Sequence, residues 1–479
     1  CVPAFTGDNG GATHRGVTAE TIKIAYYEPK PDPQTDALLQ ISGAYDAPDD
    51  TWAAYQAYLA IYEEALETYG RDIELVRLKG TGSATDAVAA RADAIRADEL
   101  GVFAVLNGPS QTKAFAEELA ARDILCIGTC LIAQPRQFYL DNLPYIWNGN
   151  PSPDQTSIHT QEIIETQLVG KPAEYAGDEE LRDQERSFAL LTYDTPEGDF
   201  TPAWDGFKAR LEDAGIELAA HVSYFLDLAT APSDARTVVT RLKDSGATTV
   251  IFSGDPFMPI YFTQEATAQG YFPEWLLSGT VLADTAVFAR QYDQEQWAHA
   301  FGYSALPART PQEEGAAYKL HDWWYGEAPP TENNYGIVEG VVDTLMTGIH
   351  VAGPDLTPES FQAALYSLPV PEQGPLGLRL TVSYGDHGIW DGEDPNGLDD
   401  ATIVWWDPDA VGEDETGAEG PGMYRLVDGG RRYLPGEWPT DPLPLFDEEG
   451  TVTVYDSTPA ELLPPREYDP PAGAPTASG

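Results

Sequence analysis

Polar and aromatic side chains follow several strand-like segments of the chain, where they could hold a small molecule. The segment VFAVLNGPSQ places Ser110 and Gln111 in a strand-to-helix loop, whose hydroxyl, amide and backbone N–H groups can grip a carboxylate or carbonyl group. Asp255 and Phe257 follow VIFSG, where the carboxylate could accept from a donor and the ring could stack. These groups suit reversible binding of a solute.

Other side chains occupy comparable positions at the ends of predicted strands. They are Tyr27 in TIKIAYY, Thr129 after ILCIG, Tyr193 in FALLTYD, and Thr280 after EWLLSG. Each position also has a structural alternative. Tyrosines at strand ends often pack in a core, and residues such as Ser110 and Asp255 often cap the helix that follows. The sequence leaves both alternatives open.

Motifs for covalent or metal chemistry are missing from the sequence. The chain has no GxSxG elbow, no GxGxxG loop, and no HExxH pair among its 7 histidines. KGTGSATD lacks the GK[ST] ending of a phosphate loop, and the acidic stretch DGEDPNGLDD does not match the spaced calcium loop. We therefore expect no enzyme activity, no bound metal and no cofactor.

The elements that must position these residues alternate between strand and helix. Strand patterns at ETIKIAYY, DIELVRLKG, VFAVLNG and ILCIGT are separated by helical patterns, and the rhythm restarts after YIWNGNPSPDQ with RSFALLTYD, IELAAHVSYF, ATTVIFSG and EWLLSGT. This alternation predicts parallel sheets with helices on both faces. Ligands bind beyond the carboxyl ends of such strands, so two facing sheets would share one site between them.

The composition restricts the partners of the chain. The 479 residues include 78 acidic and 27 basic side chains, which gives a net charge of −51. Such a charge repels phosphate backbones and anionic lipid surfaces, so we expect neither nucleic-acid binding nor direct docking on a membrane. No run of residues is apolar over the ~18–20 positions of a membrane span.

The 3 cysteines suggest an extracytoplasmic protein. Cys1 precedes the polar stretch FTGDNGGATHRG, a pattern typical of a lipoprotein whose cysteine thiol carries a diacylglycerol and whose residues 1–15 form a stalk. This anchor would be the only contact with the membrane. Cys126 and Cys130 could form a disulfide outside the cell, provided that the chain turns at Gly128. The sequence leaves their pairing open.

The order of elements resembles the solute-binding proteins of ABC importers of the branched-chain amino-acid type. The segments that carry the likeness are GVTAETIKIAYYEP, YIWNGNPSPDQ, NYGIVEGVVDTLMTGI and, above all, SDARTVVTRLKDSGATTVIFSGDPFMPIYFTQEATAQGYFPEWLLSG. The resemblance covers about residues 16–400. It implies an α/β fold of two doubly wound parallel-sheet lobes joined by hinge crossovers, which is the type I periplasmic-binding fold, with an irregular C-terminal extension.

The resemblance also implies a division of the chain into domains. Residues 1–15 would form the stalk, residues 16–147 and 298–375 the N-terminal lobe, and residues 148–297 and 376–400 the C-terminal lobe. Residues 401–479, which are rich in Pro and Asp, would form the extension.

The implied function is delivery of a small polar solute, such as an amino acid, an amide or a short peptide, to an ABC permease in the membrane. The site residues implied by position are Tyr27, Ser110, Gln111, Thr129, Tyr193, Asp255, Phe257 and Thr280.

Two positions depart from the family: Met258 stands where a carboxylate holds the ligand ammonium, and Ile132 where a hydroxyl is usual. Asp255 is the nearest carboxylate to the first of these positions. Aromatic acids and urea-like solutes therefore stay open as ligands. The alternative functions are a sensor or surface interaction protein on the same fold and an α/β hydrolase.

Overall fold

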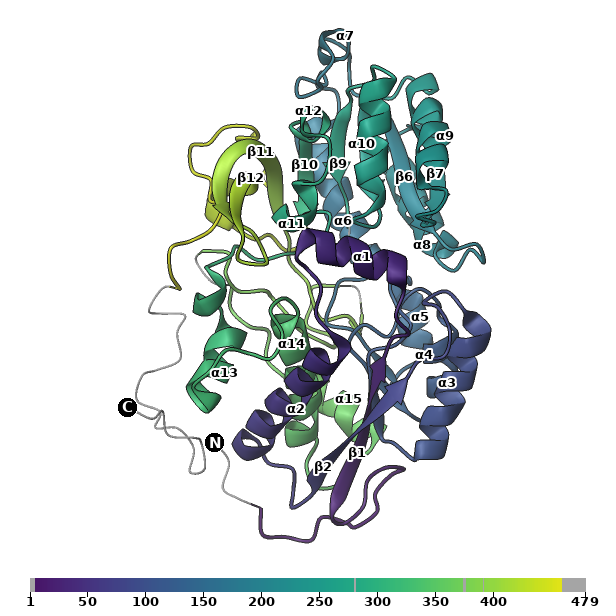
Figure 1. Cartoon of the computed structure of the whole chain (residues 1–479), viewed down its shortest axis with the longest axis vertical. Coiled ribbons are helices and arrows are strands. Elements are labelled where there is room, and N and C mark those ends of the chain that lie inside the picture. Colours follow the sequence, from purple (N-terminus) through teal and green to yellow (C-terminus); the bar gives the residue numbers. More distant parts are fainter. Residues whose placement is uncertain (1–4, 280, 374–375, 391, 459–479) are drawn as a thin grey trace.

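The computed structural model describes residues 5–279, 281–373, 376–390 and 392–458, which form two lobes stacked one above the other (Figure 1). Each lobe contains one sheet, and the orders are β2-β1-β3-β4-β5 and β12-β11-β10-β9-β8-β6-β7. All strand pairs among β1–β10 are parallel. The predicted α/β fold with two parallel-sheet lobes is confirmed.

The first lobe is built around short central strands that helices cover on both faces. Its strands are β1 (Thr21–Glu28), β2 (Asp72–Lys79), β3 (Ala104–Leu106), β4 (Leu125–Ile127) and β5 (Ile146–Trp147). One face packs against α2 (Pro48–Ala65), α13 (Ala316–Tyr325), α14 (Tyr335–Ala352) and α15 (Pro358–Tyr366). The other face packs against α3 (Ala87–Leu100), α4 (Ala114–Ala120) and α5 (Arg136–Asp141).

The second lobe follows the same plan with a wider sheet. Its parallel strands are β6 (Phe188–Asp194), β7 (Leu218–Phe225), β8 (Thr249–Ser253), β9 (Glu274–Leu277) and β10 (Ala300–Ser304). The helices around it are α6 (Pro153–Ile163), which continues as a π-helix (Ile164–Leu168), α7 (Glu179–Arg182), α8 (Thr201–Asp213), α9 (Ala231–Asp244), α10 (Met258–Ala268), α11 (Ala286–Ala289) and α12 (Gln294–Trp297). Short 3-10 turns lie at Gln312–Glu314 and Val427–Gly430.

A C-terminal hairpin completes the second sheet. This hairpin lies where the sequence predicts an irregular extension. Strands β11 (Thr402–Glu413) and β12 (Glu419–Leu426) are antiparallel, and β11 pairs with β10. Side chains of β11 alternate between the two core clusters of the lobe, with Val404 and Trp406 on one face and Ile403 and Trp405 on the other. Residues 402–426 are therefore regular structure and not irregular extension.

The predicted boundary at residue 298 also differs from the structure. Strand β10 was expected in the N-terminal lobe, but Phe301 pairs with Leu276 of β9 and extends the second sheet. The segment AFGYS is short and mostly apolar, so its pattern alone does not say which sheet it joins. The chain passes between the sheets three times: from β5 to α6, from β10 to α13, and from α15 to β11.

A glycine in α14 permits the close approach of α15. A Cβ atom at Gly348 would lie 2.2 Å from Cε2 of Phe361, whose ring is fully buried. We expect Gly348→Ala to lower the free energy of unfolding by about 1–2 kcal/mol, because overpacking outweighs the gain in helix propensity. Gly340→Ala in the same helix meets no atom within 4 Å and should instead raise it by about 0.5–1 kcal/mol. Urea denaturation of both variants tests this, and equal shifts would contradict it.

Two buried carboxyl groups lie on the third connection between the lobes. Asp399 accepts a hydrogen bond of 2.5 Å from Ser383 Oγ, and Asp394 accepts one of 3.1 Å from Gln155 Nε2. Burial raises the pKa of both carboxyl groups, and their mutual repulsion raises the pKa of Asp399 further. The folded protein therefore favours the protonated form of this pair.

A raised carboxyl pKa makes stability depend on pH. The protonated carboxyl pair contributes its full stabilisation to the folded protein below the ordinary carboxyl pKa of about 4. This stabilisation is lost as the pH rises through the raised pKa. We expect the free energy of unfolding to fall between pH 5 and pH 8.5, and Asp399→Asn to reduce this fall by at least about 1.4 kcal/mol, the equivalent of one pKa unit. Asp386→Asn, an exposed position on the same segment, serves as the control. Identical pH profiles for wild type and Asp399→Asn would contradict the prediction.

Candidate ligand-binding site

The loops that follow β3 and β4 lie together and bring the predicted site residues Ser110 and Thr129 near each other. The Asn107 side chain joins the loops, because its Oδ1 accepts from the Thr129 backbone N–H at 3.0 Å and its Nδ2 donates to the Tyr55 hydroxyl at 2.6 Å. The Ile132 N–H donates to the Ser110 carbonyl at 2.9 Å. Asn107 has a φ of +61°, a strained value that this local bonding maintains.

These two loops offer donors that the protein does not use internally. The hydroxyl groups of Ser110 and Thr129 and the amide nitrogen of Gln111 form no hydrogen bond with the described residues. All three side chains are half-buried. All three groups are uncharged hydrogen-bond donors, and their contact with a carboxylate or carbonyl oxygen of a solute stays a prediction.

A disulfide joins Cys126 in β4 to Cys130 in the loop that follows. The two Cα atoms are 6.1 Å apart, and the chain turns between them at Gly128, which has a φ of +91°. The covalent link therefore closes the loop that carries Thr129. Both sulfurs belong to fully buried residues.

One hydrogen bond between predicted site residues crosses from lobe to lobe. The Tyr193 hydroxyl, at the end of β6, donates to Gln111 Oε1 at 2.9 Å. The Tyr193 ring packs against Phe200 and Tyr224, with centroids 5.4 and 5.8 Å away. Burial raises the pKa of the Tyr193 hydroxyl, so it stays protonated and acts as a donor. The end of β6 thus contacts the loop that follows β3 in the other lobe.

The carboxylate of Asp255 is occupied by the protein itself. Oδ2 accepts from the Tyr224 hydroxyl at 2.6 Å, and Oδ1 accepts from the backbone N–H groups of Phe257 and Met258 at 2.7 and 3.0 Å. Burial raises the pKa of the Asp255 carboxyl group, and these hydrogen bonds offset only part of that rise. The structure thus supports the capping alternative, in which Asp255 holds the start of α10.

Tyr27 lies in the core instead of between the lobes. Its hydroxyl donates to Asp93 Oδ2 at 3.2 Å, and its ring centroid is 4.9 Å from that of Phe115. Neighbouring residues of a strand point to opposite faces, and helices cover both faces of this sheet, so Tyr26 and Tyr27 are both buried.

The remaining predicted positions are placed as follows. Phe257 is buried, with its ring edge-on to Phe288 at 5.6 Å, so it contributes to packing in the second lobe. Cys1 and Thr280 lie outside the described residues.

Helix α1 (Pro33–Ser42) lies between the lobes and was not expected from the sequence (Figure 1). Leu38 and Leu39 pack against the core cluster of the second lobe. The Asp32 side chain caps the helix by accepting from Gln34 N at 2.9 Å, and Pro33 occupies its first turn. This Asp-Pro pair is the signal that could have identified the helix.

A second contact between the lobes also involves residues that the sequence did not indicate. Gln134 Nε2 in the first lobe donates to the Asp199 carbonyl in the second at 2.9 Å. Gln134 is only 2% exposed. Ile132 and Ala133 beside it pack against the core cluster of the second lobe. No local pattern in the sequence marks such a contact, because its partners come from separate lobes.

Comparison with known proteins agrees with this architecture. The family described as periplasmic binding protein matches residues 37–391, about three quarters of the chain. The chain belongs to the periplasmic binding protein family. A search of curated proteins found no match.

Solved structures of periplasmic binding proteins have the same fold. A leucine-, isoleucine-, valine-, threonine- and alanine-binding protein from Brucella ovis has a TM-score of 0.59 and 13% identity, over 87% of this chain and 96% of that one. A fatty acid ABC transporter substrate-binding protein from Thermomonospora curvata has a TM-score of 0.55 and 17% identity, over 88% and 95%. An ABC transporter solute-binding protein from R. palustris in complex with 4-hydroxybenzoate has a TM-score of 0.51 and 13% identity, over 84% and 97%. The resemblance to this family and its type I fold is confirmed.

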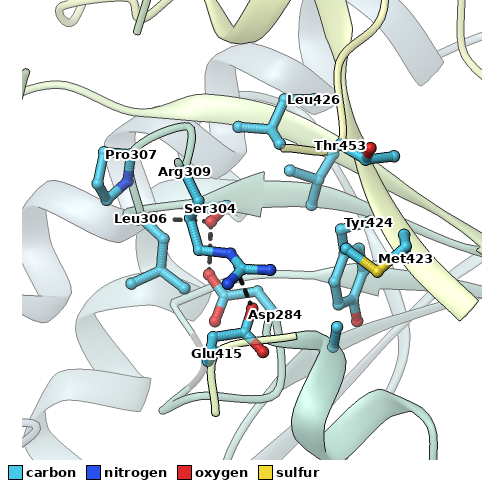
Figure 2. A pocket seen from close by; sticks show the side chains of 12 residues that line it. Asp284, Ser304, Leu306, Pro307, Arg309, Glu415, Met423, Tyr424, Leu426 and Thr453 are labelled. Carbon is cyan, nitrogen blue, oxygen red and sulfur yellow. Dashed lines mark hydrogen bonds and ion pairs between the residues drawn. The ribbon is translucent and has the colours of Figure 1, made fainter. Parts of the chain in front are cut away.

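This periplasmic binding protein also has a small cavity beside the C-terminal hairpin (Figure 2). Its volume is about 30 Å³, which suits about one or two water molecules. Ser304 Oγ donates to Asp284 Oδ2 at 2.5 Å inside it, and burial raises the Asp284 pKa to about 6. The cavity is too small for a solute, so the interface between the lobes remains the candidate site.

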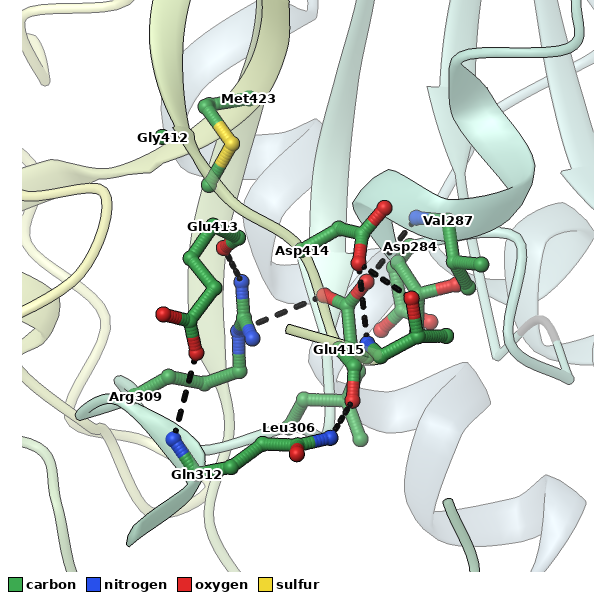
Figure 3. A network of polar contacts seen from close by, with 12 residues as sticks. Asp284, Val287, Leu306, Arg309, Gln312, Gly412, Glu413, Asp414, Glu415 and Met423 are labelled. Atoms are coloured by element: carbon green, nitrogen blue, oxygen red, sulfur yellow. Dashed lines mark hydrogen bonds and ion pairs between the residues drawn. The ribbon is translucent and has the colours of Figure 1, made fainter. Parts of the chain in front are cut away.

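The tip of the hairpin fixes the second connection between the lobes (Figure 3). Arg309 donates to the Glu413 carbonyl at 2.7 Å and forms an ion pair of 3.4 Å with Glu415. Glu415 Oε2 accepts from the Val287 N–H at 2.9 Å, and its carbonyl accepts from Gln312 Nε2 at the same distance. The tip thereby joins α11 to the segment that leaves β10.

Within the described ranges, no group of three or more His, Cys, Asp or Glu side chains could hold a metal ion. No helix in the same ranges has both the length and the apolar character needed to cross a bilayer.

Proposed function

We propose that this protein is the solute-binding component of an ABC importer, which captures a small polar solute between its lobes and delivers it to the permease. The solute would be an amino acid, an amide or a short peptide, and no bond in it would be broken. Binding would take place outside the cytoplasm, as the family description suggests. The lipid attachment expected at Cys1 stays a prediction.

The observation that carries this proposal is the contact between Gln111 and Tyr193. Gln111 lies in the loop after β3 of the first lobe and Tyr193 near the end of β6 of the second, and their side chains meet at 2.9 Å. The uncharged donors of Ser110 and Thr129 lie in the same pair of loops as Gln111. A solute that enters here can bind both lobes at once, and such binding stabilises the arrangement in which the lobes are together. The solved structures with this fold include substrate-binding proteins for amino acids, fatty acid and 4-hydroxybenzoate.

Thermal unfolding with a panel of solutes tests the proposal. We expect one class among amino acids, amides and short peptides to raise the midpoint temperature, since a ligand that binds only the folded protein stabilises it. Calorimetry of the same solutes should give a 1:1 isotherm, and chromatography afterwards should recover the solute unchanged. Conversion of the solute would favour a hydrolase, and no response to any solute would favour an interaction protein.

A further inference from the structure

Helix α1 is joined to one lobe and packed on the other. It lies in the chain between β1 and α2, which both belong to the first lobe. Its side chains Leu38 and Leu39, and Ala44 just beyond its end, pack against the core cluster of the second lobe. Among the described residues, no apolar side chain of α1 packs against the two core clusters of the first lobe. The apolar contacts of α1 therefore cross from lobe to lobe.

The C-terminal end of α1 approaches the second lobe at another point. Gly43 ends the helix with a φ of +81°, and a Cβ atom built there would lie 4.0 Å from the Thr416 Cβ atom. Thr416 lies at the tip of the hairpin of β11 and β12, where its backbone N–H and its hydroxyl donate to Asp414 Oδ1 at 2.9 and 2.7 Å. The helix thus packs on the core of the second lobe and ends beside its hairpin.

By itself, α1 is a weak element that could move as a unit. It has 10 residues, none of which is buried, and helices of fewer than ~12–15 residues are marginal in water without tertiary contacts. Residues 29–31 and 44–47, all of them described, form neither helix nor strand where they join α1 to the first lobe. Asp46 anchors the second of these segments by accepting from the backbone N–H groups of Glu332 and Asn334 at 3.0 and 2.9 Å. A movement of α1 about these segments would break no hydrogen bond of the first sheet.

The position of α1 relates it to the candidate site. β1 pairs in parallel with β3, and β3 with β4, so the carboxyl ends of these strands lie at one edge of the sheet. The segment that leads to α1 leaves β1 at that edge, and the loops that carry Ser110 and Thr129 leave β3 and β4 there. Ile132 and Ala133 of the second loop pack on the same core cluster as the leucines of α1. Separation of the lobes along this edge would break the contacts of α1 together with those of the loop.

We propose that α1 is a strap that holds the lobes together over the candidate site, and that a solute enters or leaves only while α1 is detached from the second lobe. The inference rests on the proposed function. Detachment exposes the two leucines to water, which opposes opening, because burial of apolar surface stabilises the arrangement that removes it from water. The strap thereby slows the release of a bound solute without contributing a polar contact to it.

Polar substitution of the strap tests this inference. We expect Leu38→Gln with Leu39→Gln to increase the radius of gyration of the solute-free protein in small-angle X-ray scattering, because the lobes separate more easily. Among leucine, acetamide and alanylalanine, the probe that binds most tightly should dissociate about tenfold faster from this variant in stopped-flow fluorescence. Ile41→Gln is the matched control, because Ile41 belongs to the same helix and is 77% exposed. Its dissociation rate should stay within about twofold of that of the wild type.

A disulfide that fastens α1 tests the same inference in the opposite direction. In Gly43→Cys with Thr416→Cys, the Cβ separation of 4.0 Å falls within the range of about 3.5–4.5 Å that a disulfide needs. Treatment of this variant with oxidised glutathione should slow association of the same probe about tenfold or more, and dithiothreitol should restore it. The single variant Gly43→Cys controls for the strain of a side chain at positive φ. Wild type treated with the same reagents controls for the buried disulfide of Cys126 and Cys130.

The outcomes separate this inference from the proposed function. Equal radii and equal dissociation rates for the double leucine variant, Ile41→Gln and the wild type would overturn the strap and leave a solute-binding protein. Unchanged association in the oxidised cysteine variant, with its disulfide confirmed by mass spectrometry, would also overturn the strap. An absence of binding of all three probes and of the whole panel by the wild type would overturn the proposed function and, with it, the passage of a solute past α1. Circular dichroism confirms that each variant is folded.

Discussion

Replacing Arg432 by methionine should lower the free energy of unfolding by about 3–5 kcal/mol, since it leaves a buried charge without its partner. The Arg432 side chain is 2% exposed and forms a 2.8 Å ion pair with Asp400, which is 0% exposed. The same guanidinium donates to the carbonyls of Leu306 and Ala305 at 2.7 and 2.9 Å. The Arg432 side chain thus bonds to both the second connection between the lobes, at Ala305 and Leu306, and the third, at Asp400.

The neighbouring arginine provides the matched control. Arg431 is 65% exposed at its side chain, lies 3.9 Å from Asp428, and is placed over the Tyr433 ring at 5.2 Å. Arg431→Met should cost less than about 1 kcal/mol, because exposed ion pairs and cation–π contacts contribute little. Chemical denaturation measures both variants. If Arg432→Met is too unstable to purify, the double variant with Asp400→Asn should recover part of the stability. Equal effects of the two single substitutions would contradict this account.

The second large effect concerns solute binding. The double variant Ser110→Ala with Thr129→Ala should weaken binding of the tightest solute in the panel by about 100-fold, because it removes two donors at about 1–1.5 kcal/mol each. Neither hydroxyl bonds to a described residue, so we expect the free energy of unfolding to change by less than about 0.5 kcal/mol.

Calorimetry and thermal unfolding of the same samples check these two expectations. Ser83→Ala with Thr85→Ala is the control, since these hydroxyls lie 3.4 Å from each other in an exposed loop before α3. Unchanged affinity in the Ser110 and Thr129 variant would place the solute elsewhere.

The sheets and most helices could be predicted from the sequence because their patterns are local. The strand FALLTYD is readable from its apolar run, and it occurs where expected as β6. The placement of the C-terminal segment depends on contacts with distant parts of the chain. Trp438 lies in a loop, and its indole donates to His159 Nδ1 at 3.0 Å in the second lobe. This contact spans 279 positions in the chain, and no periodicity reveals it.

The candidate site shows the same division between local and distant information. The loops with Ser110 and Thr129 are local strand-to-helix turns, so the sequence indicated them. Whether Tyr27 and Asp255 serve packing and capping or face a ligand depends on what packs against each side chain. Those neighbours come from other helices and from the other lobe, and a strand end alone does not specify them.

Mass spectrometry of the small molecules released from the purified protein tests whether a solute binds between the lobes. We expect one small solute, released on denaturation at close to one equivalent per chain, which binds again to refolded protein and is recovered unchanged. The Ser110 and Thr129 double variant should purify without it. Recovery of a converted product would contradict a protein that only binds its solute, and full retention of the solute by that variant would contradict a binding site between the lobes.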